Sequence, residues 1–400
     1  MDNSMPSKGN TLDSIIVALM ISVQYLNLVI TRLGFSSMLS QLIIFDAVLL
    51  LISVFVKNRG KIILNRKLMV LVLVLLLYYG ISRLIPNGSV STPLEFCAFC
   101  IIPVLCGSLT NINYIRVFEL LMGILCLGLP VIGSIFAKAN HSIRYDAVAL
   151  STAYILAPMI LSGVFHFVYF RKSNRTLFGL LYLVSVVFFV LYIPNSYRGP
   201  LLSMFITLVI LWIDKWELRN SPRKLIIAIL LILTFVIIYY NLTAIMVLIR
   251  DVFGKRGIGI AAIDKSLILG SNLSDGRLDL YEITLRYIGE SPIWGHGIST
   301  YIHYVPGVEY PHNFILQLLF DGGIILLFVF CIIVFPSISK IFRNRNFEPE
   351  GRVQLVLMLS GLQFTRAFFS GNIWELVQFW LLIGIIINNM CDLRNAQNEL

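Results

Sequence analysis

Two hydrogen-bonding side chains stand directly before a strongly apolar stretch of the chain. His312 and Asn313 follow Pro311, and the residues from there to 336 are mostly apolar. A neutral imidazole can take a proton from a hydroxyl group near pH 7, as a general base does. A proline suits the first turn of a helix, so we expect both side chains at the mouth of a helix. The alternative is that the pair only caps that helix.

Arginine residues form a second candidate group, because a guanidinium group can bind two phosphate oxygens at once. Arg198 lies in the short segment IPNSYRGPLL, and Arg277 opens a stretch, 277–289, with apolar residues near helical spacing. Arg83 and Arg366 lie near the ends of two other apolar segments. A cluster of such groups at a membrane surface would suit a diphosphate.

Ion pairs are the alternative explanation for some of these arginines. The candidate carboxylate partners are Glu375 for Arg366, and Asp275 or Asp279 for Arg277. The turn around Arg198 holds no acid, so an ion pair explains that arginine less well.

Patterns for metal and nucleotide chemistry are absent. His296, His303 and His312 share one segment, but their spacing matches no common zinc site. The chain has no G-x-x-x-x-G-K-[ST], H-E-x-x-H, G-x-S-x-G or Asp-x-Asp motif. The six cysteines lie mainly in apolar segments, where packing explains them without disulfides. We expect no metal and no cofactor. Asp46, within an apolar segment, is a candidate functional acid without an assigned role.

Membrane-spanning helices must position these groups. The chain has 400 residues, of which 58% are hydrophobic and 13% are charged, and its mean hydropathy is +0.86. A soluble protein this apolar could not cover its surface with polar atoms. Since a spanning helix needs roughly 20 apolar residues, we expect an all-α integral membrane protein with about 12 transmembrane helices in a single polytopic domain, 1–400. The expected helices cover residues 13–31, 38–56, 68–83, 93–108, 117–136, 147–170, 176–194, 199–213, 224–247, 313–336, 353–369 and 372–390.

Lysine and arginine residues indicate how these helices are oriented. Basic residues gather in the loops 57–67, 171–175, 214–224 and 337–352. With twelve spans, these loops and both termini fall on one side, which the positive-inside rule identifies as cytoplasmic. The net charge of +10 is then mainly a topology signal. Because the chain has no clustered basic face on a soluble module, no nucleic-acid partner is expected.

One outer segment is much longer than the others. It covers about residues 248–312, between the ninth and tenth expected helices, and it holds three of the five histidines. Loops of this length in a compact domain usually carry function. Within it, 277–289 is expected to form a short amphipathic helix on the membrane surface or on the helix bundle.

The order of these motifs resembles the O-antigen polymerase and O-antigen ligase superfamily. An Arg-Gly pair in a short outer turn is followed by a long outer loop with GR-x-x-x-Y and SPIWGHG, and then by PHN-x-x-L-Q-x-x-x-x-G-G entering a helix. The resemblance covers the twelve-helix topology and is sharpest over 194–202 and 270–323.

The resemblance implies a metal-independent glycosyltransferase of the GT-C type in the bacterial inner (cytoplasmic) membrane. Its donor would be a glycan on undecaprenyl pyrophosphate, and its acceptor a sugar hydroxyl at the periplasmic face. Carried over by position, Arg198 and Arg277 would hold the pyrophosphate, and His312, beside Asn313, would accept the proton of the attacking hydroxyl. The secondary candidates are Arg83, Arg366, His296 and Tyr310.

The chain departs from the commonest pattern of the superfamily at two positions. Asp321 stands before Gly322–Gly323 where many members have a neutral residue or glutamate. His296 stands between two glycines where an apolar residue is more usual. The resemblance leaves His296 without a role.

Three functions remain open from the sequence. A polymerase would join lipid-linked repeat units, with a separate chain-length regulator as a partner. A ligase would transfer the same glycan to lipid A–core, and a lipid-linked oligosaccharide flippase or transporter would carry it across the membrane. We favour the polymerase, because the outer segment has six basic residues against seven acidic ones and so little excess positive charge for a phosphorylated core. Transporters tend to show repeated halves, and none are visible here.

Overall fold

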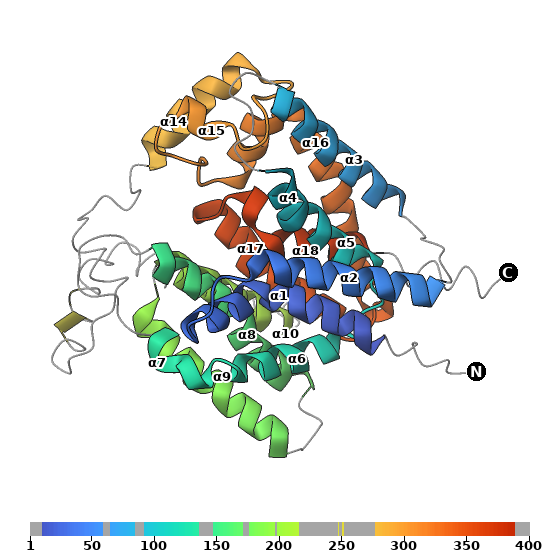
Figure 1. Cartoon of the computed structure of the whole chain (residues 1–400), viewed down its shortest axis with the longest axis vertical. Helices are drawn as coiled ribbons and strands as arrows, with labels where there is room; N and C mark the ends of the chain where they lie inside the picture. The colour runs from blue at the N-terminus through green and yellow to red at the C-terminus, as the bar shows by residue number, and fades with distance from the viewer. Residues whose placement is uncertain are drawn as a thin grey trace, which may run out of the picture.

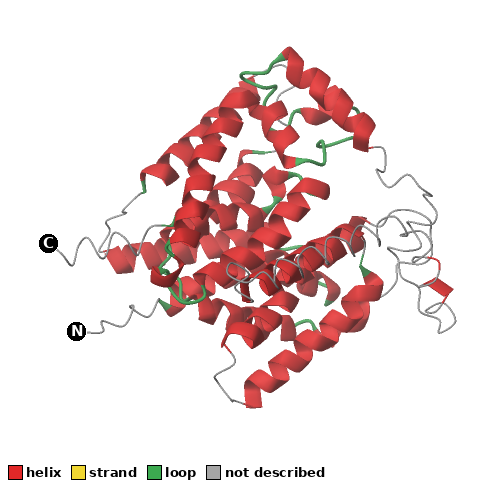
Figure 2. Ribbon diagram, turned by 180° about the vertical axis from the view of Figure 1, so that it is seen from behind, coloured by secondary structure: helices red, strands yellow, loops and turns green. Residues whose placement is uncertain are grey.

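The computed structural model describes residues 10–58, 65–84, 92–135, 147–170, 176–196, 198–215, 247, 250–251 and 277–388. Helices and the loops between them make up these parts, and no strand occurs within them (Figure 2). The expected all-α membrane fold is confirmed. Within the described ranges, six helical segments are long and apolar enough to cross a membrane, and shorter apolar helices accompany them.

The helices follow the predicted spans closely. The first half of the chain holds α1 (Thr11–Arg32), α2 (Leu39–Asn58), α3 (Arg66–Leu84), α4 (Pro93–Phe96), the π-helix η1 (Cys97–Ile101), α5 (Ile102–Leu109), α6 (Tyr114–Cys126), the 3-10 helix η2 (Leu129–Val131), α7 (Ile132–Ile135), α8 (Ala147–Phe170) and α9 (Thr176–Asn195). The second half holds α10 (Arg198–Lys215), α14 (Arg277–Glu290), α15 (Tyr301–Tyr304), α16 (Phe314–Arg343), η4 (Arg345–Phe347), α17 (Arg352–Phe369), η5 (Ile373–Glu375) and α18 (Val377–Ile387). The predicted span 224–247, apart from its last residue, and most of the outer segment before 277 lie outside the described residues.

Some predicted spans prove to be broken or shifted. The span 117–136 is interrupted after Cys126, where Gly128 and Pro130 end α6 and a 3-10 turn follows. The span 372–390 begins instead with the short helix η5, and α18 covers only Val377–Ile387. Helix α16 runs on to Arg343 through Pro336, so part of the loop predicted at 337–352 is helical.

Glycines let the central helices approach closely, as is common between membrane helices. A Cβ atom on Gly107 of α5 would lie 2.5 Å from the carbonyl oxygen of Leu381 in α18, and one on Gly384 would lie 3.0 Å from the Cα of Gly107. On the other side of the bundle, a Cβ on Gly361 of α17 would meet the side chain of Thr207 in α10 at 2.5 Å. Helices α17 and α18 are therefore fixed against α10 and α5 by backbone contact.

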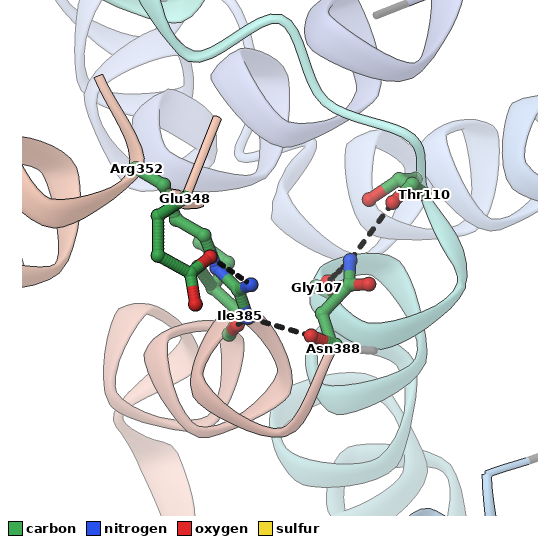
Figure 3. Close-up of polar contacts among 6 residues, drawn as sticks. All are labelled: Gly107, Thr110, Glu348, Arg352, Ile385 and Asn388. Atoms are coloured by element: carbon green, nitrogen blue, oxygen red, sulfur yellow. Dashed lines mark hydrogen bonds and ion pairs between the residues drawn. The ribbon is translucent and has the colours of Figure 1, made fainter. Parts of the chain in front are cut away.

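A hydrogen-bonded network ties the helix ends together at one end of the bundle (Figure 3). The guanidinium group of Arg352 pairs with Glu348 at 2.7 Å and donates to the carbonyl oxygens of Ile385 and Asn388 at 3.0 Å and 2.6 Å. The amide of Asn388 donates in turn to Gly107 and Thr110. This network joins α17, α18 and the end of α5. We call this the basic end, because Arg352 closes the basic loop 337–352 and Asn65, in the basic loop 57–67, donates a hydrogen bond to Ile387 O.

The outer segment docks on α16 at the opposite end, where Figure 1 shows α14 and α15 beside α16 and α3. Within α16, Gly323 has φ 62° and ψ −163°, so the helix breaks there. The SPIWGHG motif fills the break by backbone hydrogen bonds: His296 N donates to Phe320 O at 2.7 Å, Gly297 N to Asp321 O at 2.9 Å, and Ile324 N to Pro292 O at 2.9 Å. The glycine pair of the sequence motif is therefore a docking point for the loop.

Helix α3 also holds the docked loop that contains the SPIWGHG motif. The hydroxyl of Ser82 accepts a hydrogen bond from Ile298 N at 2.7 Å and donates to Tyr78 O at 2.6 Å. Because the loop is held by α3 and α16 together, the residues that follow it along the chain start from a fixed position.

Candidate functional site

His312 lies two residues before the first residue of helix α16, in a left-handed turn with φ 54°. Asn313 is the N-cap, because its side-chain oxygen accepts hydrogen bonds from Ile315 N at 3.0 Å and Leu316 N at 3.3 Å. The predicted start of this span, at 313, agrees to within one residue with the observed start at Phe314. Pro311 lies before the helix and not in its first turn, because the extended backbone and the side chain of Asn313 set the boundary. The capping role considered for Asn313 is thus present in the structure.

The imidazole of His312 has a free nitrogen in a partly buried place. Its ring lies 4.3 Å from the ring of Tyr310, centroid to centroid. Its Nδ1 atom is buried and finds no hydrogen-bond partner among the described residues. The ring is thus held by packing and leaves one nitrogen for a group that the described chain does not supply.

The first turn of α14 faces His312. Arg277 is the first residue of α14, as predicted, and Tyr281, one turn later, donates a long hydrogen bond of 3.4 Å to the backbone oxygen of His312. Burial and, to a smaller extent, the positive charge of Arg277 together lower the pKa of His312 to about 4. The imidazole is therefore neutral at pH 7.

Aromatic hydroxyl groups hold α14 in place. Thr284 of α14 shares a hydrogen bond of 2.7 Å with the hydroxyl of Tyr301, and the hydroxyl of Tyr287 donates to Tyr304 O at 3.2 Å. Both contacts join α14 to α15 within the docked segment. Arg277 and His312 consequently stand on one framework.

His296 belongs to this framework. Its Nε2 atom is 2.7 Å from the carbonyl oxygen of Tyr287, and its Nδ1 atom is 3.2 Å from the hydroxyl of Tyr304. A carbonyl oxygen only accepts, so Nε2 carries the proton and Nδ1 accepts from Tyr304. The ring also stacks on Phe320, with centroids 4.8 Å apart. Both nitrogens of His296 are occupied, which explains this residue as an anchor of the loop.

A second wall of the site comes from α8, α10 and α17. The hydroxyl of Tyr310 donates to Ser370 O at 3.2 Å, which ties the segment before His312 to the end of α17. The guanidinium carbon of Arg366 lies 5.0 Å from the centroid of the Tyr154 ring. A Cβ atom on Gly199 would lie 3.0 Å from the Ser370 hydroxyl and 3.4 Å from Cζ of Tyr154.

Arg198 is the first residue of α10 and precedes Gly199. Its backbone therefore lies at the Tyr154–Ser370 wall, while its side chain is outside what the structure describes. The structure brings together His312, Tyr310, Arg277 and Arg366, with the start of α10 beside them. Arg83 lies apart from these residues, exposed in the last turn of α3 beside Ser82.

The proposed ion pairs of the arginines do not form among the described residues. Glu375 lies near Arg366, but its Oε1 atom accepts a hydrogen bond from Asn372 at 2.7 Å. Asp275 lies outside the described residues, and no ion pair joins Arg277 to Asp279 in the described part of the chain.

The described residues contain no group of three histidine, cysteine, aspartate or glutamate side chains that could hold a metal ion. Asp46 in α2 is buried, and neither of its carboxyl oxygens has a hydrogen-bond partner within the described ranges. Asp321 is also buried, and its Oδ2 atom accepts a hydrogen bond of 2.5 Å from the indole of Trp374. That bond ties the broken part of α16 to η5.

Sequence reasoning missed Tyr154, Tyr281 and Ser370. A signal existed for Tyr281, because the GR-x-x-x-Y motif puts it one helical turn after Arg277, on the same face. No sequence motif indicates Tyr154 or Ser370, because these residues reach the site only through the packing of α8 and α17.

Comparison with known proteins supports the resemblance seen in the sequence. Residues 195–331 match a family model described as O-antigen ligase. The matched stretch includes Arg198, Arg277, the docked loop and His312, and it covers about a third of the chain. A search of the curated proteins finds no match. The match confirms the similarity to the O-antigen ligase and polymerase superfamily and supports, at a coarse level, a multi-pass membrane enzyme of that kind.

Proposed function

We propose that this protein is a polymerase that joins undecaprenyl-pyrophosphate-linked oligosaccharide repeat units. It would work at the periplasmic face of the bacterial inner membrane, with both termini in the cytoplasm. The observation that carries the proposal is the free Nδ1 of a neutral His312 beside the cationic Arg277, within the stretch that matches the O-antigen ligase family.

Glycosyl transfer from such a donor needs two kinds of group. The hydroxyl oxygen of the acceptor sugar attacks the anomeric carbon of the donor glycan, and the bond from that carbon to the pyrophosphate oxygen breaks. The proton of the hydroxyl passes to His312, and the bonding electrons leave with the pyrophosphate. Arg198 and Arg277 would bind this anion and stabilise the charge that develops on it. A single in-line displacement inverts the configuration at the anomeric carbon.

The electrostatics of His312 suit a base that becomes stronger when the donor binds. In the free protein, burial and the charge of Arg277 hold the pKa of His312 at about 4. A bound pyrophosphate would offset the charge of Arg277 and raise that pKa toward its ordinary value, about 6.5. A base with a pKa closer to the working pH accepts a proton more effectively.

The remaining residues would position this pair. Asn313 fixes the start of α16 as its N-cap, and Tyr310 packs against the imidazole. The resemblance implies no metal and no cofactor, and the arginines would supply the positive charge that a metal supplies in other enzymes. Membrane lipids and a chain-length regulator are the expected partners, in addition to the two glycan substrates.

The ligase is the second candidate, favoured because the matched family is described as O-antigen ligase. A ligase acting on phosphorylated lipid A–core would be expected to carry more positive charge on its outer segment, which here has six basic and seven acidic residues. Deletion of the gene separates the two. A surface glycan with core plus one repeat unit supports the polymerase, and loss of all repeats from the core with accumulation of lipid-linked polymer supports the ligase.

Purified protein with synthetic lipid-linked repeat units tests the proposal directly. Extension of the units without another enzyme is the expected result. Failure of wild-type protein to extend them, together with transport of the intact lipid across vesicles, would instead support a flippase.

A further inference from the structure

Arg366 is a partly buried cation whose charge is not matched within the described chain. No ion pair there includes it, and its Nε atom is buried without a hydrogen-bond partner among the described residues. The face of the Tyr154 ring, 5.0 Å away, is its clearest favourable contact. A cation–π contact offsets only part of the cost of taking a charge out of water. The guanidinium group therefore has donors available for an anionic ligand.

Glu375 does not fill this role. It lies close enough to Arg366 to interact with it electrostatically, but it forms its hydrogen bond with Asn372 instead. An arginine kept only for structure would be expected to use its planar donors on such a carboxylate.

The position of Arg366 joins the two parts of the candidate site. On one side is Tyr310, an electrostatic neighbour of Arg366, whose ring packs on His312. On the other side, Tyr154 contacts Gly199 at the start of α10. The N-terminus of a helix carries partial positive charge and favours an anion. Arg366 thus lies between the imidazole and a helix start that also bears Arg198.

We propose that Arg366, on α17, binds the pyrophosphate of the lipid-linked donor. This proposal rests on the proposed function, since the pyrophosphate is the anion of that reaction. Arg277 would hold the diphosphate from the docked loop, and Arg366 would hold it from α17. Arg366 stands outside residues 195–331, so the part of the chain beyond the family match would contribute a substrate-binding group.

The test uses full-length protein in lipid nanodiscs and two readouts. The first is binding of undecaprenyl pyrophosphate without any sugar, with undecaprenyl monophosphate as the comparison ligand. The second is extension of a synthetic lipid-linked repeat unit, with kcat and KM measured separately. Arg366→Ala should weaken binding of undecaprenyl pyrophosphate and raise KM by about 10- to 100-fold, as expected for a lost charge-assisted contact. Arg366→Lys should restore part of both, because it keeps the charge but not the planar pair of donors.

Two further variants keep the test decisive. Arg286→Ala removes an exposed arginine from α14 and should bind and extend like wild type, which controls for the net charge of the outer face. Glu375→Gln should also behave like wild type. If Arg366 were only the partner of Glu375, this variant would lose as much as Arg366→Ala, and the proposal would be wrong.

The two proposals can fail separately. If wild-type protein extends the repeat units and Arg366→Ala binds undecaprenyl pyrophosphate with unchanged affinity, the role of Arg366 is refuted and the polymerase stands. If wild-type protein neither binds this lipid nor extends the units, both are refuted. If Arg366→Ala does not fold, Arg366→Lys serves as the test. Binding and KM equal to those of wild type in Arg366→Lys would refute a bidentate contact between Arg366 and the pyrophosphate.

Discussion

The break in α16 offers a sharp test of how the outer segment positions the site. Gly323 has φ +62°, a conformation that alanine adopts only with strain. A Cβ atom at this position would lie 2.7 Å from Trp294 N and still closer to the carbonyl group of Ile293. Both neighbours are backbone atoms of the docked loop, so neither can move aside by a change of side-chain rotamer. We predict that Gly323→Ala displaces the loop.

The size of the effect follows from these distances. Ordinary van der Waals contact begins at 3.4 Å, so Trp294 N alone must move away by about 0.7 Å, and the Ile293 carbonyl must move farther. The loop leads through α15 to Tyr310 and His312. Misplacement of a reacting group by about 1 Å can lower a rate about 100-fold. The backbone of Gly323, with φ 62° and ψ −163°, lies in a region that is essentially restricted to glycine, and an alanine held there adds about 1–3 kcal/mol of strain. We expect turnover about 100-fold below wild type in a protein that still folds.

Gly307→Ala is the matched control. Gly307 also has a left-handed φ, +82°, but a Cβ there would meet no atom within 4 Å. The Gly307→Ala variant should have the backbone strain of a left-handed φ without displacement of the docked loop, so it should retain most of the wild-type activity. The assay is extension of synthetic lipid-linked repeat units, together with thermal unfolding of each variant. Equal activities of Gly323→Ala and Gly307→Ala would refute the positioning role of the docked loop.

The other predictions concern single side chains. His312→Ala should lower turnover by about 10²- to 10⁴-fold at normal expression, whereas near-normal polymer would remove it from the role of base. Because the neutral imidazole of His312 is the active form and its pKa is about 4, kcat/KM should stay constant as pH falls from 8 to about 5. Arg277→Ala should raise the pKa of His312, so that the loss of kcat/KM at acidic pH begins at a higher pH. An unchanged pH profile in this variant would contradict an electrostatic effect of Arg277 on His312. Ser82→Ala should speed hydrogen exchange at the Ile298 amide, since that amide loses its acceptor at a cost of about 1–3 kcal/mol, and unchanged exchange would argue against this anchor. Arg352→Ala should lower the unfolding temperature clearly while leaving the KM of the folded fraction unchanged, because its network lies at the basic end, and a changed KM would count against that separation.

The positions of the helices could be predicted because their signal is local. A run of about 20 apolar residues is sufficient to indicate a spanning helix, and the apolar spacing after Arg277 placed the start of α14 correctly. The breaks were harder to predict. Gly323 interrupts α16 only because another segment supplies the missing hydrogen bonds, and those donors come from residues near 296 in the sequence.

The candidate site also has one part that the sequence indicates and one part that only the structure reveals. The motif order identified His312 and Arg277 as a pair, and the structure shows that they interact. Arg366 was a candidate from the sequence, but its neighbours Tyr154 and Ser370 meet the site by packing between helices far apart in the sequence, so no local pattern indicates them. The role of His296 depends on the contacts of both ring nitrogens with Tyr304 and Tyr287, which no sequence pattern indicates.

A density map of the protein with an undecaprenyl-pyrophosphate-linked repeat unit bound would test the central claim most directly. We predict that the pyrophosphate oxygens lie within hydrogen-bond distance of the guanidinium groups of Arg277 and Arg198, and that the anomeric carbon faces the ring of His312. A pyrophosphate held at the basic end of the bundle, or beyond the reach of both arginines, would contradict it.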